Sequence, residues 1–189
     1  MADCTGQTDE KIMIRVSTER EAFGCIVDRY EEKLLRYLRR IMPGLGEEAF
    51  DVLQEIFIKA YVNAQGFDTT LSFSSWIYRI AHNEAVNWLR KKKARPETIE
   101  LGDDDFQTFT QSMEIAHGTH ERALTKDAVT RTLSHMPEKY YTVLVLHFLE
   151  GKSYEEISDI LTMPSGTVAT LLHRAKKQFS SIHEQHHDE

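Results

Sequence analysis

Apolar residues recur three or four positions apart along most of this chain, which is typical of amphipathic helices that bury one face. Residues 9 to 16 predict a short first helix. Thr18 and Glu21 predict the start of a longer second helix that ends near Pro43 and Gly44. The apolar stripe of this second helix consists of Phe23, Ile26, Val27, Tyr30, Leu34, Tyr37, Leu38 and Ile41. No stretch of useful length alternates like a strand, so the predicted fold class is all-α.

A third helix is predicted over residues 48 to 65, and its two stripes differ in character. The stripe expected to be buried consists of Phe50, Leu53, Phe57, Ala60 and Tyr61. The other stripe mixes aliphatic and polar residues, namely Asp51, Gln54, Glu55, Ile58 and Val62. A purely solvated face would be polar throughout, so this mixed stripe indicates either a partner-binding surface or a solvated face with two chance aliphatics.

A fourth helix is predicted from about residue 71 to residue 90, after a short loop that begins at Gly66. Its inward positions are Trp76, Ile77, Ile80, Ala81 and Leu89. Its polar face consists of Arg79, His82, Asn83, Asn87 and Arg90, with Tyr78 at the edge. Interleaved basic and aromatic residues can attract phosphates and stack unpaired bases. The alternative interpretation is a core tryptophan with a solvated opposite face.

The pattern near the C-terminus predicts a helix-turn-helix. Ser153 and Glu156 have the spacing of a capping box, and Pro164 ends the helix that they start. Ser165 can cap a second helix, whose predicted buried stripe is Val168, Leu171, Leu172 and Ala175. Its outer face, the candidate DNA reader, carries Thr167, Thr170, Arg174 and Lys177.

Charge is distributed unevenly, although the whole chain of 189 residues has a net charge of −7. Residues 1–95 carry 15 Lys and Arg against 14 Asp and Glu, whereas residues 96–125 carry 1 against 7. Residues 126–189 carry 7 against 9. The acidic middle segment has no sustained helical periodicity, so we interpret it as a tether between two helical domains, with Phe106, Phe109 and Met113 able to dock on a neighbour.

Composition narrows the class of protein further. The two cysteines, Cys4 and Cys25, have no Cys-x-x-Cys spacing, so reduced thiols are expected rather than a disulfide framework or a zinc site. No membrane span or signal peptide is visible, which predicts a cytoplasmic protein without direct membrane insertion. Metal binding is a weak hypothesis because the clustered histidines lack spaced cysteine or carboxylate partners; these are His117, His120, His183, His186 and His187.

Several stretches resemble conserved segments of the extracytoplasmic-function (group IV) sigma factors of bacterial RNA polymerase, in family order and spacing. These are DVLQEIFIKAY at 51–61, FSSWIYRIAHN at 73–83, MPEKY at 136–140, LEGKSYEEI at 149–157, PSGTV at 164–168 and HRA at 173–175. The resemblance implies a protein without enzymatic activity or cofactors. It also implies a region 2 helical domain over 1–95, an acidic linker over 96–125 and a region 4 helix-turn-helix over 126–189.

The resemblance further implies three binding surfaces. The clamp coiled coil of the largest subunit of core RNA polymerase would bind Asp51, Gln54, Glu55 and Ile58. The non-template strand of the minus-ten element, with a base flipped out, would bind Phe67, Asp68, Trp76, Tyr78, Arg79, Asn83, Asn87 and Arg90. The minus-thirty-five element of promoter DNA would bind Ser165, Thr167, Thr170, His173, Arg174 and Lys177. The linker would follow the RNA exit path of the polymerase, and an anti-sigma factor would hold the protein inactive.

The sequence departs from the family pattern in its second helix-turn-helix segment. Ala169 and Leu171 stand where family members usually carry cations. This difference predicts that the helix attracts DNA phosphates more weakly than the same helix of its relatives does. Thr162 stands where glycine is common, and a β-branched residue would be strained there if the backbone needs a positive φ.

The main alternative function is a stand-alone dimeric helix-turn-helix regulator. An enzyme is a weaker alternative, because the chain shows no nucleophile elbow, phosphate-cradling glycine loop or zincin motif.

Overall fold

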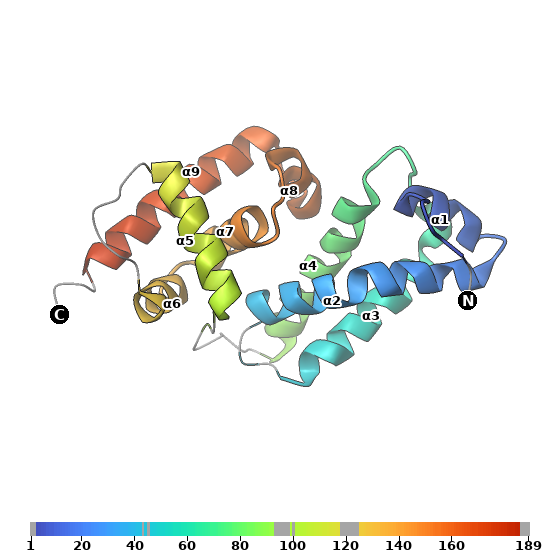
Figure 1. The fold of residues 1–189 in the computed structure, drawn as a ribbon, viewed down its shortest axis with the longest axis horizontal. Helices are drawn as coiled ribbons and strands as arrows, with labels where there is room; N and C mark the ends of the chain where they lie inside the picture. Colours follow the sequence, from blue (N-terminus) through green and yellow to red (C-terminus); the bar gives the residue numbers. More distant parts are fainter. Residues whose placement is uncertain are drawn as a thin grey trace. The chain divides into compact units, whose positions relative to one another are not determined.

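The structure is a computed structural model that describes residues 3–42, 44, 46–92, 99, 101–117 and 125–185, except the side chains of residues 92 and 114–117. Helices and their connections make up these described residues, with no strand among them, so the predicted all-α class is confirmed. The chain divides into two compact units, whose main segments are Met1–Arg95, and Pro96–Ser158 with Thr162–Glu189. Figure 1 shows the helices of each unit.

The described residues of the first unit form a helical bundle. Its elements are α1 (Asp9–Val16), the 3-10 helix η1 (Arg20–Ala22), α2 (Phe23–Ile41), α3 (Glu48–Val62), the 3-10 helix η2 (Ala64–Gly66) and α4 (Phe73–Lys92). Helices α2, α3 and α4 pack against one another, and α1 contacts both α2 and α4 (Figure 1). The largest fully buried side chains of this unit are Ile12, Ile26, Leu34, Tyr37, Leu38, Met42, Ile56, Phe73 and Ile77. The apolar stripe therefore forms a continuous core.

The start of α2 differs from the prediction. Thr18 was expected to open the helix, but its hydroxyl donates to the Arg15 carbonyl at 3.1 Å and so closes the end of α1. The chain then makes the 3-10 turn η1 before α2 begins at Phe23. The predicted stripe of α2 is otherwise buried, with Val27 half-buried. The periodicity predicted the helix face correctly but not its cap.

The buried face of α3 is rotated relative to the prediction. Its buried residues are Ala49, Val52, Leu53, Ile56 and Ala60. Phe50 and Tyr61, expected in the core, are 43% and 37% exposed. Their rings lie at the edge of the bundle, where Phe50 faces the Arg39 guanidinium at 5.5 Å and Tyr61 packs on Phe23 at 5.3 Å. Because both α2 and α4 contact α3, the face centred on Ile56 is the one that becomes buried.

The second unit is built around the packing of α7 on α9. Its elements are α5 (Asp103–His117), α6 (Lys126–Ser134), α7 (Glu138–Leu144), the π-helix η3 (Val145–Leu149), α8 (Tyr154–Leu161) and α9 (Ser165–Gln185). Helix α5 contacts η3 and α6, while α6 also contacts α9 (Figure 1). The core of this unit includes Phe109, Leu133, Leu144, Leu146, Ile157, Val168, Leu172 and Phe179.

The segment interpreted as a tether contains a helix that the sequence pattern did not predict. Helix α5 spans half of the acidic region, and its Phe109 is 1% exposed. The Phe109 ring lies 5.8 Å from that of Phe148 and 5.3 Å from that of Phe179. Docking of Phe109 and Met113 on neighbouring helices was expected, and both are buried. Tertiary packing thus accounts for a helix in a segment whose own periodicity is weak.

The expectation of two reduced thiols is wrong for this structure, in which Cys4 and Cys25 form a disulfide. Helix α1 contacts α2, so the segment before α1 returns to the first turns of α2. This tertiary contact, rather than a local motif, brings the two sulfur atoms together.

Within the described residues, none of the helices is both long and apolar enough to cross a membrane.

Candidate nucleic-acid interface

An aromatic cluster lies where the loop after α3 meets the start of α4. The Phe67 ring is 5.5 Å from that of Phe73 and 5.0 Å from that of Trp76. Phe73 and Trp76 are also 5.6 Å apart. Phe67 and Phe73 are buried, whereas Trp76 is half-buried. The cluster therefore offers the Trp76 indole as its accessible aromatic surface, while Phe67 supports it from beneath.

The loop before α4 is held by Asp68. Its carboxylate accepts the Thr70 backbone N–H at 3.0 Å and the Thr70 hydroxyl at 2.7 Å, while its carbonyl accepts the Leu71 N–H at 3.0 Å. These hydrogen bonds to Thr70 hold the pKa of Asp68 below its ordinary value. The exposed carboxylate therefore stays charged and fixes the turn, and it remains accessible to a ligand.

Four predicted DNA-binding residues of α4 lie on accessible positions. Asn83, Asn87 and Arg90 are exposed, and Arg79 is half-buried. Residues three or four apart on a helix share a face, so these side chains can form one polar strip. Their positions agree with the polar face expected from the sequence.

Tyr78 does not belong to that accessible strip, contrary to the prediction, and the half-buried His82 contacts α2 through Tyr37. Tyr78 is 3% exposed, and its ring packs 5.2 Å from that of Tyr37. The Tyr37 hydroxyl lies 3.1 Å from Nδ1 of the half-buried His82. Burial lowers the pKa of His82 to about 4, so its imidazole is neutral near pH 7. Both side chains contact Tyr37 and fill space between α2 and α4. Tyr78 is therefore not an accessible stacking surface.

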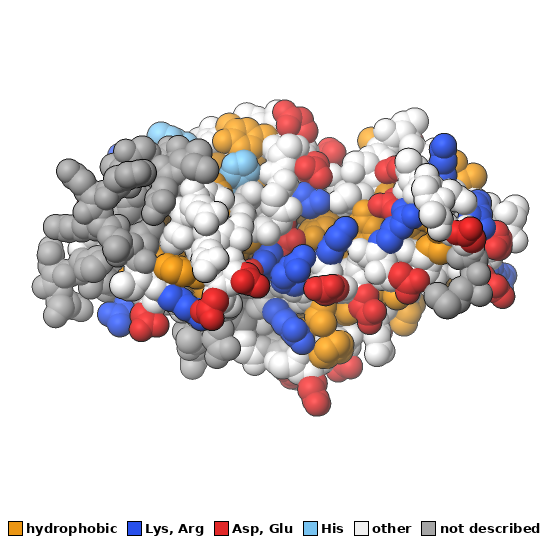
Figure 2. Space-filling model, viewed as in Figure 1, with side chains coloured by type: hydrophobic (Ala, Val, Ile, Leu, Met, Phe, Trp, Pro, Cys, Tyr) orange, Lys and Arg blue, Asp and Glu red, His pale blue; other side chains and the backbone are white. Residues whose placement is uncertain are grey.

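The mixed stripe of α3 is exposed along its length, as predicted. Its members Asp51, Gln54, Glu55, Ile58 and Val62 are all accessible. Ile58 is 55% exposed and Val62 is 70% exposed. Figure 2 shows acidic, basic and hydrophobic side chains interspersed over α2 and α3. The stripe therefore places two aliphatic side chains among exposed polar ones.

The predicted helix-turn-helix is formed by α8 and α9. The Ser153 hydroxyl accepts the Glu156 N–H at 3.1 Å, and the Glu156 carboxylate accepts the Ser153 N–H at 2.9 Å. This reciprocal capping box confirms the predicted start of α8. Helix α9 begins at Ser165, and the carbonyl of Pro164 accepts the first-turn N–H groups.

The outer face of α9 agrees with the predicted one. Val168, Leu172 and Ala175 are fully buried, whereas Leu171 is only half-buried. The exposed candidates for upstream DNA are Ser165, Thr167, Thr170, His173, Arg174 and Lys177. The Thr170 hydroxyl donates to the Gly166 carbonyl at 2.9 Å and retains lone pairs for an external donor.

The turn between α8 and α9 has the strained backbone that the sequence suggested. Thr162 has φ 53° and ψ 51°, the left-handed region that glycine adopts at low cost. The Met163 N–H donates to the Ser158 carbonyl, and the Ser158 hydroxyl donates to the Met163 carbonyl. These bonds hold Thr162 in that conformation despite its branched side chain.

We expect Thr162→Gly to stabilise the helix-turn-helix by about 0.5–1 kcal/mol, because relief of left-handed strain exceeds the entropy that glycine adds to the unfolded chain. Native-state hydrogen exchange of the α9 amides measures this change. Thr108→Gly, at an exposed position within α5, is the matched control and should destabilise the second unit. Equal losses in both variants would show that Thr162 is unstrained.

The histidines considered for metal binding have structural roles or lie outside the described side chains. His183 Nδ1 lies 3.3 Å from the Thr132 hydroxyl, and its ring stacks on Phe179 at 5.9 Å. His120, His186 and His187, together with the side chain of His117, lie outside the described part. The described residues contain no group of three metal-ligating side chains.

Glu10 is a residue that the sequence pattern did not place near the aromatic cluster. Its carboxylate accepts the Phe73 backbone N–H, at the first residue of α4, at 3.0 Å. Glu10 and Phe73 are 63 positions apart, so no local spacing could predict this contact.

These two helical units, one of which ends in an exposed helix-turn-helix, define a class of all-helical DNA-binding proteins. The chain matches the family Sigma-70 region 2 over residues 26–95 and the family Sigma-70, region 4 over residues 126–179. It is 36% identical over 166 residues to the ECF RNA polymerase sigma factor SigW of Bacillus subtilis, covering 84% of this chain and 87% of the relative. It is 32% identical over 180 residues to the ECF RNA polymerase sigma-E factor of Haemophilus influenzae, covering 92% and 94%. The chain belongs to the family of ECF RNA polymerase sigma factors, and the stand-alone regulator is not favoured.

Solved structures show the same fold at lower identity. The chain is similar to CnrH, solved in complex with the cytosolic domain of CnrY, with a TM-score of 0.67 and 22% identity over 94% of this chain and 97% of that chain. It is also similar to the sigma factor RpoE of Bartonella quintana, solved in complex with the anti-sigma factor NepR. That match has a TM-score of 0.61 and 16% identity over 86% of this chain and 96% of that chain.

Proposed function

We propose that this protein acts in the cytoplasm, where it binds core RNA polymerase, recognises promoter DNA and promotes strand separation without enzymatic activity of its own. The observation that carries the proposal is the exposed mixed stripe of α3, in a chain of the ECF sigma family that also carries an exposed polar strip on α4. The first surface supplies a site for a protein partner in addition to the site for DNA.

For the polymerase contact, we assign the clamp coiled coil to Asp51, Gln54, Glu55 and Ile58. Ile58 supplies apolar area at the centre of this stripe. Gln54 and Glu55 are exposed beside it and can accept hydrogen bonds from cationic or amide donors of a partner. An apolar centre with a polar rim is the usual composition of a protein interface.

For the minus-ten element, we assign the non-template strand to the aromatic cluster and the α4 strip. Trp76 is the accessible ring on which a base can stack, while Asn83 and Arg79 lie further along the helix. Unstacking a base costs a few kcal/mol, and stacking on an aromatic side chain returns about 1–3 kcal/mol. Phe67 acts as a support for Trp76 in this scheme, and Tyr78 is left out because it is buried.

For the minus-thirty-five element, we assign the exposed face of α9 to the major groove. Arg174 and Lys177 supply the cations of this face, and Thr167 and Thr170 supply short hydrogen-bonding groups. Ala169 and half-buried Leu171 add no charge, so phosphate attraction is weak. The acidic segment is proposed to follow the RNA exit path, with α5 packed on the second unit.

For regulation, we propose an anti-sigma factor that covers the same surfaces. One structurally similar protein, the sigma factor RpoE of Bartonella quintana, was solved with the anti-sigma factor NepR, and another, CnrH, was solved with the cytosolic domain of CnrY. The exposed side chains of Ile58 and Val62 form an apolar surface. Its burial under a partner would be favourable, because it removes apolar area from water.

We expect Gln54→Ala with Glu55→Ala to weaken binding to core RNA polymerase by about thirtyfold, because two polar contacts at roughly 1 kcal/mol each are lost. The measurement is the dissociation constant of purified full-length protein for core polymerase. The matched control is Glu31→Ala with Glu32→Ala on α2, where both side chains are also exposed. Unchanged affinity of the α3 variant would count against the clamp assignment.

A further inference from the structure

We propose that the Cys4–Cys25 disulfide is a reversible redox link that controls how firmly α1, through Glu10, holds the first turn of α4. The disulfide closes the segment that contains α1, and α1 carries the carboxylate that accepts the Phe73 N–H. The inference rests on the proposed function only where it extends to promoter opening. The link between disulfide and α4 is a property of the protein alone.

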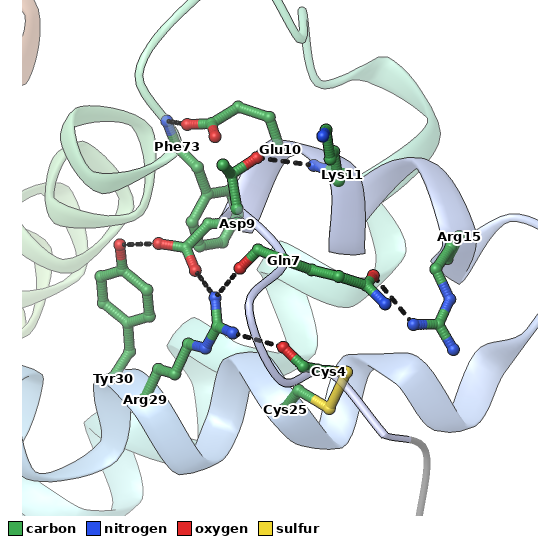
Figure 3. A network of polar contacts seen from close by, with 11 residues as sticks. Cys4, Gln7, Asp9, Glu10, Lys11, Arg15, Cys25, Arg29, Tyr30 and Phe73 are labelled. Carbon is green, nitrogen blue, oxygen red and sulfur yellow. Dashed lines mark hydrogen bonds and ion pairs between the residues drawn. A yellow bond between two sulfur atoms is a disulfide. The ribbon is translucent and has the colours of Figure 1, made fainter.

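The segment before α1 is tied to α2 by one arginine. Arg29 on α2 donates to the carbonyls of Cys4 and Gln7, each at 2.9 Å, and forms an ion pair with Asp9 at 2.6 Å (Figure 3). The Tyr30 hydroxyl donates to the second oxygen of Asp9 at 2.6 Å. Arg29 therefore binds the backbone carbonyls at both ends of the turn from Cys4 to Gln7, as well as the Asp9 carboxylate.

The chemical state of this network is stable near neutral pH. Burial and the hydrogen bond to Asp9 raise the pKa of Tyr30 above its ordinary value, so the hydroxyl remains a donor. The ion pair is only partly exposed, with 33% and 22% of the Arg29 and Asp9 side chains accessible. The Tyr30 hydroxyl therefore keeps its hydrogen bond to Asp9 near neutral pH, whereas a change in the thiol state removes the covalent link between Cys4 and Cys25.

Helix α1 connects the region of the disulfide to the aromatic cluster at the start of α4. Asp9 and Glu10 are adjacent in its first turn, and they face different partners (Figure 3). Asp9 bonds to α2, while Glu10 bonds to the backbone of Phe73. Phe73 contacts both Phe67 and Trp76, so the position of α1 bears directly on the aromatic cluster.

Loss of the disulfide increases the number of conformations that the segment before α1 can adopt. The two cysteines are 21 positions apart, and closing a loop of about that length favours the closed state by on the order of 100-fold in population. We expect the Arg29 contacts to keep α1 folded in the reduced protein as well. Its local opening becomes more frequent, and Glu10 leaves the Phe73 N–H more often.

The redox step is a thiol–disulfide exchange with a low-molecular-weight disulfide such as oxidised glutathione. One cysteine thiolate attacks a sulfur of the small disulfide, which forms a mixed disulfide and releases one small thiolate. The second cysteine thiolate then attacks the protein sulfur, which forms the Cys4–Cys25 bond and releases the other small thiolate. Two protein thiols are oxidised and one small disulfide is reduced, and the two protons lost by the cysteines pass through solvent to the two released thiolates, which become thiols. Disulfides of cytosolic proteins are commonly of this transient, redox-sensing kind.

The first experiment uses the full-length protein without polymerase, equilibrated in glutathione buffers of different oxidation state. Cys4 and Cys25 are the two cysteines of the chain, so alkylation and mass measurement report the linked fraction directly. We expect conversion between fully linked and fully reduced protein, with exchange of the α1 and Phe73 amides about tenfold or more faster after reduction. A protein that stays reduced in oxidised glutathione, or equal exchange in both states, would overturn the proposal.

The second experiment compares promoter opening by holoenzyme reconstituted from linked or reduced protein. We expect the linked protein to open promoters about threefold faster, because a held pocket needs less ordering when it binds the strand. Cys4→Ser protein should open at the rate of the reduced protein in both buffers, which separates this effect from any redox response of the polymerase. If linked and reduced protein open promoters at the same rate, the disulfide affects only the local stability of α1. The proposed effect on promoter opening would then be wrong. Failure of every form to bind polymerase would instead refute the proposed function, and the exchange result would still decide the link to α4.

The positioning role of Glu10 has its own test. Glu10→Ala removes the acceptor for the Phe73 N–H, whereas Glu10→Gln keeps an amide oxygen in its place. We expect Glu10→Ala to slow promoter opening while polymerase affinity stays unchanged, and Glu10→Gln to restore most of the rate. Equal defects in the two variants, or loss of polymerase binding with Glu10→Ala, would show that Glu10 acts through charge or general stability instead.

Discussion

Asn83→Ala should slow promoter opening by roughly tenfold or more, while Arg174→Ala should slow it less, because a well-placed contact to a base edge is worth about 1–3 kcal/mol. Asn83 is exposed on α4, beyond the aromatic cluster. The recognition helix α9 lacks cations at Ala169 and Leu171, so a smaller share of promoter binding can come from its face. The measurement is permanganate reactivity of the melted strand with reconstituted holoenzyme.

Two comparisons make this result specific. Trp76→Ala should impair opening at least as strongly as Asn83→Ala, since it removes the accessible ring of the cluster as well as contacts with Phe67 and Phe73. Each holoenzyme is first tested for assembly, so that a lost polymerase contact is not mistaken for a lost DNA contact. If Arg174→Ala abolishes opening and Asn83→Ala leaves it intact, α9 dominates promoter choice and this assignment is wrong.

Helical periodicity predicted those elements whose apolar stripe is narrow and continuous. The stripe of α2 is buried as expected, and the capping box at Ser153 and Glu156 marks the start of α8 correctly. Helix α3 shows the limit of this reasoning, because it has apolar residues around much of its circumference. The sequence cannot decide which of these faces two neighbouring helices will cover, so Phe50 was expected in the core instead of Ile56.

Long-range contacts account for the features that the sequence did not predict. The Cys4–Cys25 link and the contact of Glu10 with Phe73 both depend on where α1 lies against other helices. The burial of Tyr78 likewise reflects a partner on α2. None of these contacts leaves a local spacing in the sequence, whereas the exposed stripe of α3 and the outer face of α9 do.

Phe109→Ala should destabilise the second unit by about 3–5 kcal/mol, the usual cost of removing a fully buried phenylalanine side chain. Phe109 lies between the rings of Phe148 and Phe179, from η3 and α9, and it anchors α5 to both. Native-state hydrogen exchange measures the effect directly. The slowest amides of α7 and α9 should exchange about 150-fold to about 4,000-fold faster, because 1.4 kcal/mol corresponds to a factor of about ten.

Phe106→Ala is the matched control for this substitution, because Phe106 lies one turn earlier on α5 and is only half-buried. It should cost less than Phe109→Ala, since less of its side chain is removed from water on folding. A purely flexible tether predicts no change in α7 and α9 exchange for either substitution. A large effect confined to Phe109 would instead make α5 an integral helix of the second unit, and the part of the acidic segment free to follow the polymerase would then be limited to the chain on either side of α5.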